Sequence, residues 1–135
     1  MNLPLLFQRR VLTIDMGQNL ELPNFEGEQP GDTYYFLPLT CYLFGVVNNA
    51  TATKCAKMNA YVWLEGEGDR GANNITSCLL KDFKVRGYFD APNYGDITII
   101  ADNCGGQNKN KVVVRFLMWL VETKIFPMVQ LIFSC

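Results

Sequence analysis

The sequence predicts an α/β domain built on a mixed sheet of five strands. Segments typical of strands fill the first half of the chain, and a helix, a strand, a second helix and a last strand follow. The composition agrees, because 135 residues with 49% hydrophobic and 19% charged side chains suffice for one buried core. We therefore expect residues 1–135 to form a single domain.

Three strands are expected in the first half, over residues 11–16, 33–47 and 57–64. The first and third alternate in polarity or side-chain type, and the second is rich in aromatic and β-branched residues. Pro38 lies inside the second segment and indicates an edge position or a bulge. Residues 22–32 are rich in proline, glycine and acidic side chains, which predicts a loop.

The second half begins with a helical period. Asn73 or Asn74 is expected to cap this first helix, and Gly87 is expected to close it. Its apolar face is predicted from four residues at helical spacing: Ile75, Cys78, Leu79 and Phe83.

A continuous apolar segment over residues 96–101 predicts a central strand covered on both faces. A helix that is apolar nearly all round is expected over 111–123, and a last strand over 127–133. The three strands joined by turns should pair antiparallel, and the strand–helix–strand units should be parallel and right-handed.

Charge and residue content exclude several function classes. The formal net charge of −1 gives no whole-chain attraction to nucleic acid or membranes, so any such contact needs a local patch. The chain has no histidine, which excludes Ser-His-Asp and Cys-His nucleophiles and zinc sites that need imidazole. Carboxylates remain as the strong acid, base or metal-binding groups.

The cysteines and the apolar segments predict an intracellular protein. Five cysteines without Cys-x-x-Cys spacing, and no signal peptide before them, favour reduced and mostly buried thiols. Charged residues and Pro127 interrupt the apolar residues 112–133, whereas a membrane span needs about 20 nearly uncharged residues, so no membrane contact is expected.

Two aspartates have positions that suit metal binding. Asp15 lies within or at the end of the first predicted strand, and Asp102 ends the fourth. If these strands are neighbours, both carboxylates reach one spot at the carboxyl ends of the strands, where α/β sheets bind ligands. Paired carboxylates repel each other unless a cation lies between them, and Mg²⁺ or Mn²⁺ is the expected ion. The alternative is that both are ordinary turn or helix-cap residues.

The polar loop after Asp102 leads into the second helix. Its glycines and the helix N-terminus suit an anion, although the loop has neither the Walker spacing nor a G-x-G-x-x-G pattern. Lys109 and Lys111 either contact a phosphate of a nucleic acid or are simply solvated. A plain capping turn is the alternative for the loop as a whole.

Three sequence blocks, in order, resemble a domain of unknown function found in many transposon-derived eukaryotic proteins. Residues 14–23 are similar to its opening D-x-x-Q-N-L-x-L-P segment. Residues 61–63, 70–73 and 77–80 are similar to its middle block. Residues 101–110, Ala-Asp-Asn-Cys-Gly-Gly-Gln-Asn-Lys-Asn, resemble its D-x-C-x-G-Q-N-K-N signature.

That family is in turn similar to DDE transposases, which have the ribonuclease H-like fold. The resemblance implies that Asp15 and Asp102 match the first two metal-binding aspartates of a Mg²⁺-dependent nuclease. It also implies that Gln107, Asn108 and Lys109 position the DNA backbone or brace the loop, in a protein of the cell nucleus.

The chain departs from the family pattern at two acidic positions. Asn74 occupies a place where the family has a glutamate, and the third acidic residue is expected beyond the fifth strand. Glu122, on the second predicted helix, is the only acidic residue after Asp102. We therefore expect a fragment truncated at its C-terminus, with very weak or no catalysis.

Two functions follow from the resemblance. The first is the N-terminal part of a DDE-type transposase or integrase domain, which in intact form cleaves or joins DNA phosphodiesters with Mg²⁺ or Mn²⁺. The second is a domesticated or decayed module that binds nucleic acid or protein without catalysis. A small α/β domain without a metal is the third alternative.

Overall fold

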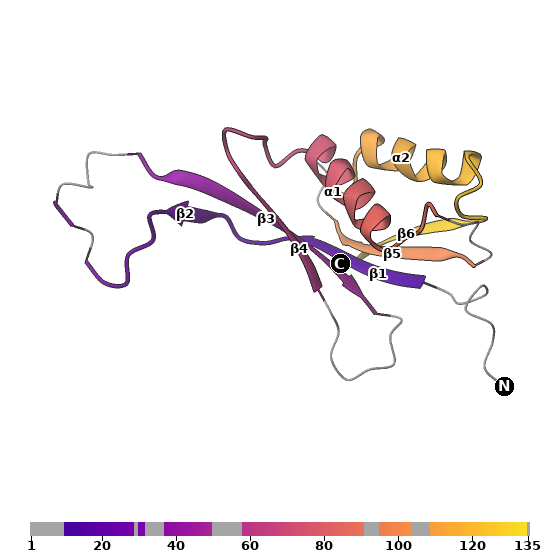
Figure 1. Ribbon diagram of the computed structural model, residues 1–135, viewed down its shortest axis with the longest axis horizontal. Coiled ribbons are helices and arrows are strands. Elements are labelled where there is room, and N and C mark those ends of the chain that lie inside the picture. Colours follow the sequence, from indigo (N-terminus) through magenta and orange to yellow (C-terminus); the bar gives the residue numbers. More distant parts are fainter. Residues whose placement is uncertain are drawn as a thin grey trace.

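The computed structural model is an α/β protein with a six-stranded mixed sheet and two helices among the described residues (Figure 1). The structure describes residues 10–28, 30–31, 37–49, 58–90, 95–103 and 109–134. The strands are β1 (Arg10–Met16), β2 (Leu20–Leu22), β3 (Leu39–Asn48), β4 (Met58–Leu64), β5 (Ile97–Asp102) and β6 (Val129–Ser134), and the helices are α1 (Ala72–Val85) and α2 (Lys111–Glu122).

The long strands follow the order β4-β3-β1-β5-β6 across the sheet. β3 pairs antiparallel with both β1 and β4, whereas β5 pairs parallel with β1 and with β6. The predicted arrangement of three antiparallel strands followed by two parallel ones is therefore confirmed. β1 is central because the antiparallel and parallel halves meet on it.

The prediction of five strands was wrong by one. β2 forms where no strand was predicted, with its last residue, Leu22, inside the predicted loop. It pairs antiparallel with the first three residues of β3, on the same edge of β3 as β1. All three β2 residues are exposed. Its pairing depends on a neighbouring strand rather than on burial, so the local hydrophobic pattern gives little signal.

The prediction that Pro38 marks an edge or bulged strand was also wrong. β3 begins at Leu39, directly after the proline, and has partners on both edges. A proline just before a strand costs no ladder hydrogen bond, which explains why the strand can be internal. Residues 33–36, the first part of the predicted strand, lie outside the described residues.

Both helices cover one face of the sheet, and the core lies between that face and the helices (Figure 1). Ile14 of β1 is in register with Val46 of β3 and with Ala101 of β5, and all three are buried there. The helices contribute the rest of the core: Ala72, Ile75, Leu79 and Phe83 from α1, and Val113, Phe116, Leu117 and Leu120 from α2.

The N-terminal end of α1 differs from the prediction, whereas its C-terminal end agrees with it. Neither Asn73 nor Asn74 caps the helix, because it begins at Ala72 and its N-cap is Gly71, without a side-chain hydrogen bond. At the other end Gly87 takes a φ of 76°, which favours glycine. The Gly87 and Tyr88 amides donate to the carbonyls of Lys84 and Phe83, which completes a Schellman motif.

A buried carboxylate joins α1 to β4. Asp82 on α1 is fully buried, and its Oδ1 accepts hydrogen bonds from Asn59 Nδ2 and Tyr61 Oη of β4, both at 2.8 Å. Its Oδ2 accepts from Arg86 Nε at 2.7 Å. Burial, and then the bond to Asp82, raise the pKa of Tyr61 far above its ordinary value.

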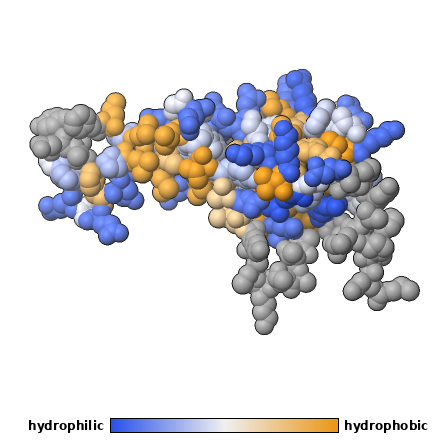
Figure 2. Space-filling model, in the orientation of Figure 1, coloured by the Kyte–Doolittle hydropathy of each residue, from blue (hydrophilic) through white to orange (hydrophobic). Residues whose placement is uncertain are grey.

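The sheet extends beyond the helices at β2 and the first part of β3 (Figure 1). Hydrophobic side chains gather over this extension in Figure 2, where Leu20, Leu22 and Leu39 are exposed. None of the described helices is long and apolar enough to cross a membrane. Among the cysteines, Cys41 and Cys78 carry free thiols, and Cys55, Cys104 and Cys135 lie outside the described residues.

Candidate functional site

Asp15 and Asp102 lie at adjacent positions on neighbouring strands. β1 and β5 are parallel, with Ile14 in register with Ala101, so the next residue of each strand is an aspartate. Neighbouring strands are about 4.8 Å apart, and residues in register point to the same face. The two acidic side chains, far apart in the sequence, therefore stand side by side, as predicted.

Both aspartates belong to the face of the sheet that the helices leave open. Leu12, Ile14 and Met16 of β1 point into the core, so Asp15 between them points away from it and is exposed. Asp102 has the same relation to Ala101 on β5. The period of two along each strand thus puts a charged residue next to the core without burying it.

A cavity of about 230 Å³ on this face is lined by both aspartates. Thr13 and Ser134 bring hydroxyl groups to it. The Ser134 hydroxyl donates to the Ala101 carbonyl at 3.3 Å, and the Thr13 hydroxyl accepts from the Asn49 side chain. The cavity therefore presents two carboxylates and two neutral hydroxyls, a set of oxygen ligands that suits a hard divalent cation.

Thr13 and Ser134 were not predicted from the sequence as site residues. Thr13 lies two residues before Asp15 and so shares its face, a signal available from the strand period alone. Ser134 lines the cavity because it is in register with Asp102 across β5 and β6. That pairing is a tertiary fact, and nothing in the local sequence indicates it.

A third acidic ligand is not supplied by the described residues. Asn74, at the position where a glutamate was expected, lines a different cavity between β4 and α1, and its amide donates to Asp69. Glu122 lines a cavity between α2 and β6, on the helix-covered face. Within the described part of the chain, no three His, Cys, Asp or Glu side chains lie close enough to hold a metal ion.

The predicted nucleic-acid-binding residues are only partly described. Gln107 and Asn108 lie outside the described residues. Lys109 and Lys111 are exposed at the N-terminus of α2 and line a cavity of about 480 Å³ together with Arg115. The Lys109 ammonium lies 6.0 Å from the centre of the Phe133 ring, near the carboxyl ends of β5 and β6. These three cations form a basic patch close to the Asp102 end of the sheet.

The end of the polar loop is a helix cap. The Asn110 side chain accepts a hydrogen bond from the Val112 amide at 2.9 Å, and Asn110 has extended backbone angles, as an N-cap residue requires. The capping interpretation of this turn is therefore confirmed for its last residue.

Two further side chains, Arg70 and Cys78, were not predicted to have a role at a site. Arg70 lies in the segment between β4 and α1, and its side chain donates to the Gly17 carbonyl at 3.4 Å. This hydrogen bond connects the segment before α1 to the residue that follows β1. Cys78 lines the cavity between β4 and α1, and burial raises its pKa to about 11. A thiol with a raised pKa is a poor nucleophile at neutral pH, so Cys78 is a packing residue.

Residues 33–135 match the DUF7869 family, which is described as a domain of unknown function. The chain belongs to this family. No curated protein and no solved structure matches it. The match covers β3 to β6 and both helices, so it includes Asp102 and the basic patch, whereas Asp15 precedes the matched residues.

Proposed function

We propose that this DUF7869 chain is a ribonuclease H-like domain of the DDE transposase type, which binds a divalent metal through Asp15 and Asp102. The observation that carries the proposal is the adjacency of these carboxylates on the central parallel strands, at the edge of one cavity. The strand order supports the ribonuclease H-like assignment, because three antiparallel strands precede two parallel ones.

The donor set fits one Mg²⁺ or Mn²⁺ ion. Mg²⁺ is usually held by one or two carboxylates and keeps several waters, so a third protein carboxylate is not needed for binding. Asp15 and Asp102 would hold the ion. When bound, it would polarise a phosphodiester and lower the pKa of an attacking water or hydroxyl.

The chain's own residues would act around that ion by charge and position. The two carboxylates repel each other in the absence of a cation, which favours occupation of the cavity by one. Lys109 and Lys111 lie at the same end of the sheet and would neutralise phosphates of a bound DNA strand. Such a protein would act in the cell nucleus.

Catalysis by this chain is expected to be very weak. Two-metal phosphoryl transfer uses several carboxylates to hold both ions, and the described residues offer two. The same observation favours the second candidate function, a decayed or domesticated module that binds nucleic acid or protein through this surface without cutting it.

Titration calorimetry with Mn²⁺ tests the metal site. The wild-type chain should give a saturable binding isotherm with Mn²⁺. The Asp15→Asn and Asp102→Asn variants should each give no binding heat. Glu65→Gln is the matched control, because Glu65 is an exposed carboxylate in the turn after β4, away from the cavity. Equal heats in the wild type and both aspartate variants would overturn the metal site.

A DNA assay separates the two candidate functions. Slow Mn²⁺-dependent cleavage of a labelled strand that is lost in Asp102→Asn supports the nuclease. Binding that is lost in a Lys109→Ala, Lys111→Ala double variant, without cleavage, supports the non-catalytic module.

A further inference from the structure

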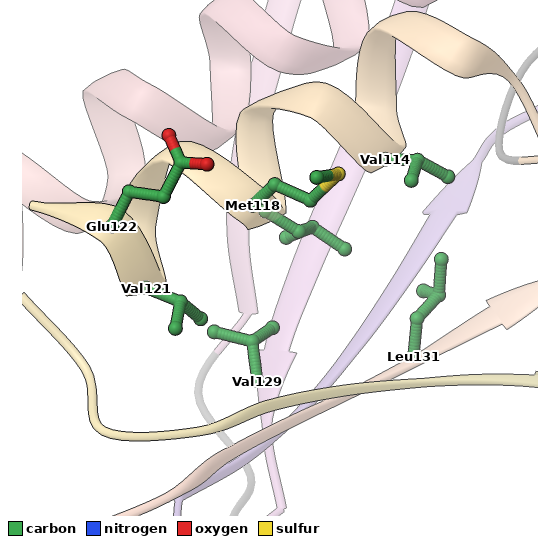
Figure 3. Close-up of a pocket in the computed structure, with 7 residues that line it drawn as sticks. Val114, Met118, Val121, Glu122, Val129 and Leu131 are labelled. Carbon is green, nitrogen blue, oxygen red and sulfur yellow. The ribbon is translucent and has the colours of Figure 1, made fainter.

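A groove runs between α2 and β6 on the helix-covered side of the edge strand (Figure 3). It has a volume of about 460 Å³ and an apolar lining. In Figure 3 Val121 lies over Val129, Val114 lies over Leu131, and Met118 lies between them. Met118, Val114 and Val121 are 55%, 44% and 39% exposed, which is high for three large apolar residues on one helical stripe.

The strand that borders this groove has an open edge. β6 pairs with β5, and no other described strand pairs with it. The amide of Ile97 donates to the Met128 carbonyl, and Ile97 is in register with Val129. By the alternation of a parallel ladder, the N–H and C=O groups of Val129 and Leu131 point away from β5.

β6 also lacks the devices that usually protect an edge strand. Its sequence, Val-Gln-Leu-Ile-Phe-Ser, contains no charged residue and no proline. Ile132 on the strand and Met128 just before it are 41% and 50% exposed. An open, uncharged and apolar edge is suited to pairing with a further strand.

The charges on α2 indicate which strand would pair there. Val114, Met118 and Val121 form an apolar stripe along α2, and two exposed charged residues lie beside it. Arg115 is three residues before Met118, and Glu122 is four residues after it. In an antiparallel pair of α2 helices centred on Met118, each Arg115 therefore meets the partner's Glu122. The same arrangement brings each Val114 onto the partner's Val121.

We propose that a second copy of this chain occupies the groove, in a twofold dimer that joins the two β6 strands antiparallel and packs α2 on the partner's α2. Since Val121 lies over Val129 and Val114 over Leu131, the middle of the groove falls at position 130, and the strands pair about that position. Val129 then opposes the partner's Leu131, so the outward-pointing backbone groups of both residues meet. The dimer has one continuous sheet and is independent of the metal site.

Charge reversal tests this arrangement in the 135-residue chain. By light scattering after gel filtration, the wild type should have the mass of a dimer. Arg115→Glu opposes two glutamates at each contact and Glu122→Arg opposes two arginines, so either variant should raise the dimer dissociation constant about 10- to 100-fold. Both positions are exposed, and circular dichroism checks that each variant is folded.

Mixing the two single variants gives the decisive outcome. At one contact the glutamate introduced by Arg115→Glu would face the arginine introduced by Glu122→Arg. The original pair would form at the second contact, so the mixture should recover a heterodimer. A wild-type chain that stays monomeric overturns the proposal and leaves the groove to another segment or partner. A dimer that withstands both reversals also overturns it, since another surface must then hold the subunits together.

Discussion

Replacing Asp82 by alanine is expected to be one of the most destabilising polar substitutions in this fold, because it removes the centre of the polar contacts between α1 and β4. The carboxylate is fully buried and accepts three hydrogen bonds, from Asn59, Tyr61 and Arg86, at 2.7–2.8 Å. Removing it leaves the 15%-exposed Arg86 side chain without its charge partner and two β4 donors without an acceptor.

The magnitude follows from these contacts. Breaking a buried ion pair by removing one partner costs about 3–5 kcal/mol, and the partial exposure of Arg86 favours the lower end of that range. For a chain of this size, a loss of about 3 kcal/mol lowers the melting temperature by roughly 10–15 °C. Urea denaturation at neutral pH, with a two-state fit, measures the loss directly.

The two carboxylate oxygens allow a sharper comparison. Asn59 and Tyr61 donate to Oδ1, whereas Arg86 donates to Oδ2. Asp82→Asn can keep an acceptor for the β4 donors but turns an amide donor toward Arg86. It should therefore cost about 1.5–3 kcal/mol, less than Asp82→Ala. Lys84→Ala, at an exposed position on the same helix, is the control and should cost under about 0.5 kcal/mol.

A double-mutant cycle with Arg86→Ala completes the test. Because Arg86 and Asp82 contact each other, the double variant should be less destabilised than the sum of the single ones by at least about 1 kcal/mol. A loss of less than about 1 kcal/mol in Asp82→Ala, or additive effects of the two changes, would refute this role of Asp82.

Two other predictions concern the cap of α2 and the response of the fold to alkali. Asn110→Ala removes the acceptor for the Val112 amide and should lower the free energy of unfolding by about 1 kcal/mol in urea denaturation, whereas no change would show that the cap contributes nothing. Tyr61 has a raised pKa, mainly through burial, so its folded form retains the proton after the unfolded form has lost it. The stabilisation is full below the ordinary value of 10.0 and is lost as the pH rises above it. Urea midpoints measured at increasing pH should therefore fall above about pH 10, and less steeply in Tyr61→Phe; equal slopes would contradict the assignment.

The sequence was sufficient for the elements whose hydrophobic period is strong. α1, α2, β1 and β5 follow from their apolar spacing, since each must bury one face or both against a neighbour. β2 was missed because all of its residues are exposed, and its existence depends on β3 alongside it.

The candidate site was predictable to a similar degree. Asp15 is the penultimate residue of β1 and Asp102 is the last residue of β5. The expectation that those strands are neighbours is confirmed by the register of Ile14 with Ala101. Ser134 and Arg115 were missed, because their proximity to the aspartates and lysines arises from the pairing of β5 with β6 and the packing of α2.

The sequence by itself determined the order of both helices and of five of the six described strands, the absence of imidazole chemistry and the positions of two carboxylates at or next to strand ends. Only the tertiary structure decided that Asn74 and Glu122 lie away from those carboxylates. It also decided that β6 pairs with no described strand other than β5, and that its other edge lies beside an apolar groove. The physical reason is that periodicity fixes which face of its own element a side chain occupies. Which elements share that face depends on pairings between segments far apart in the chain.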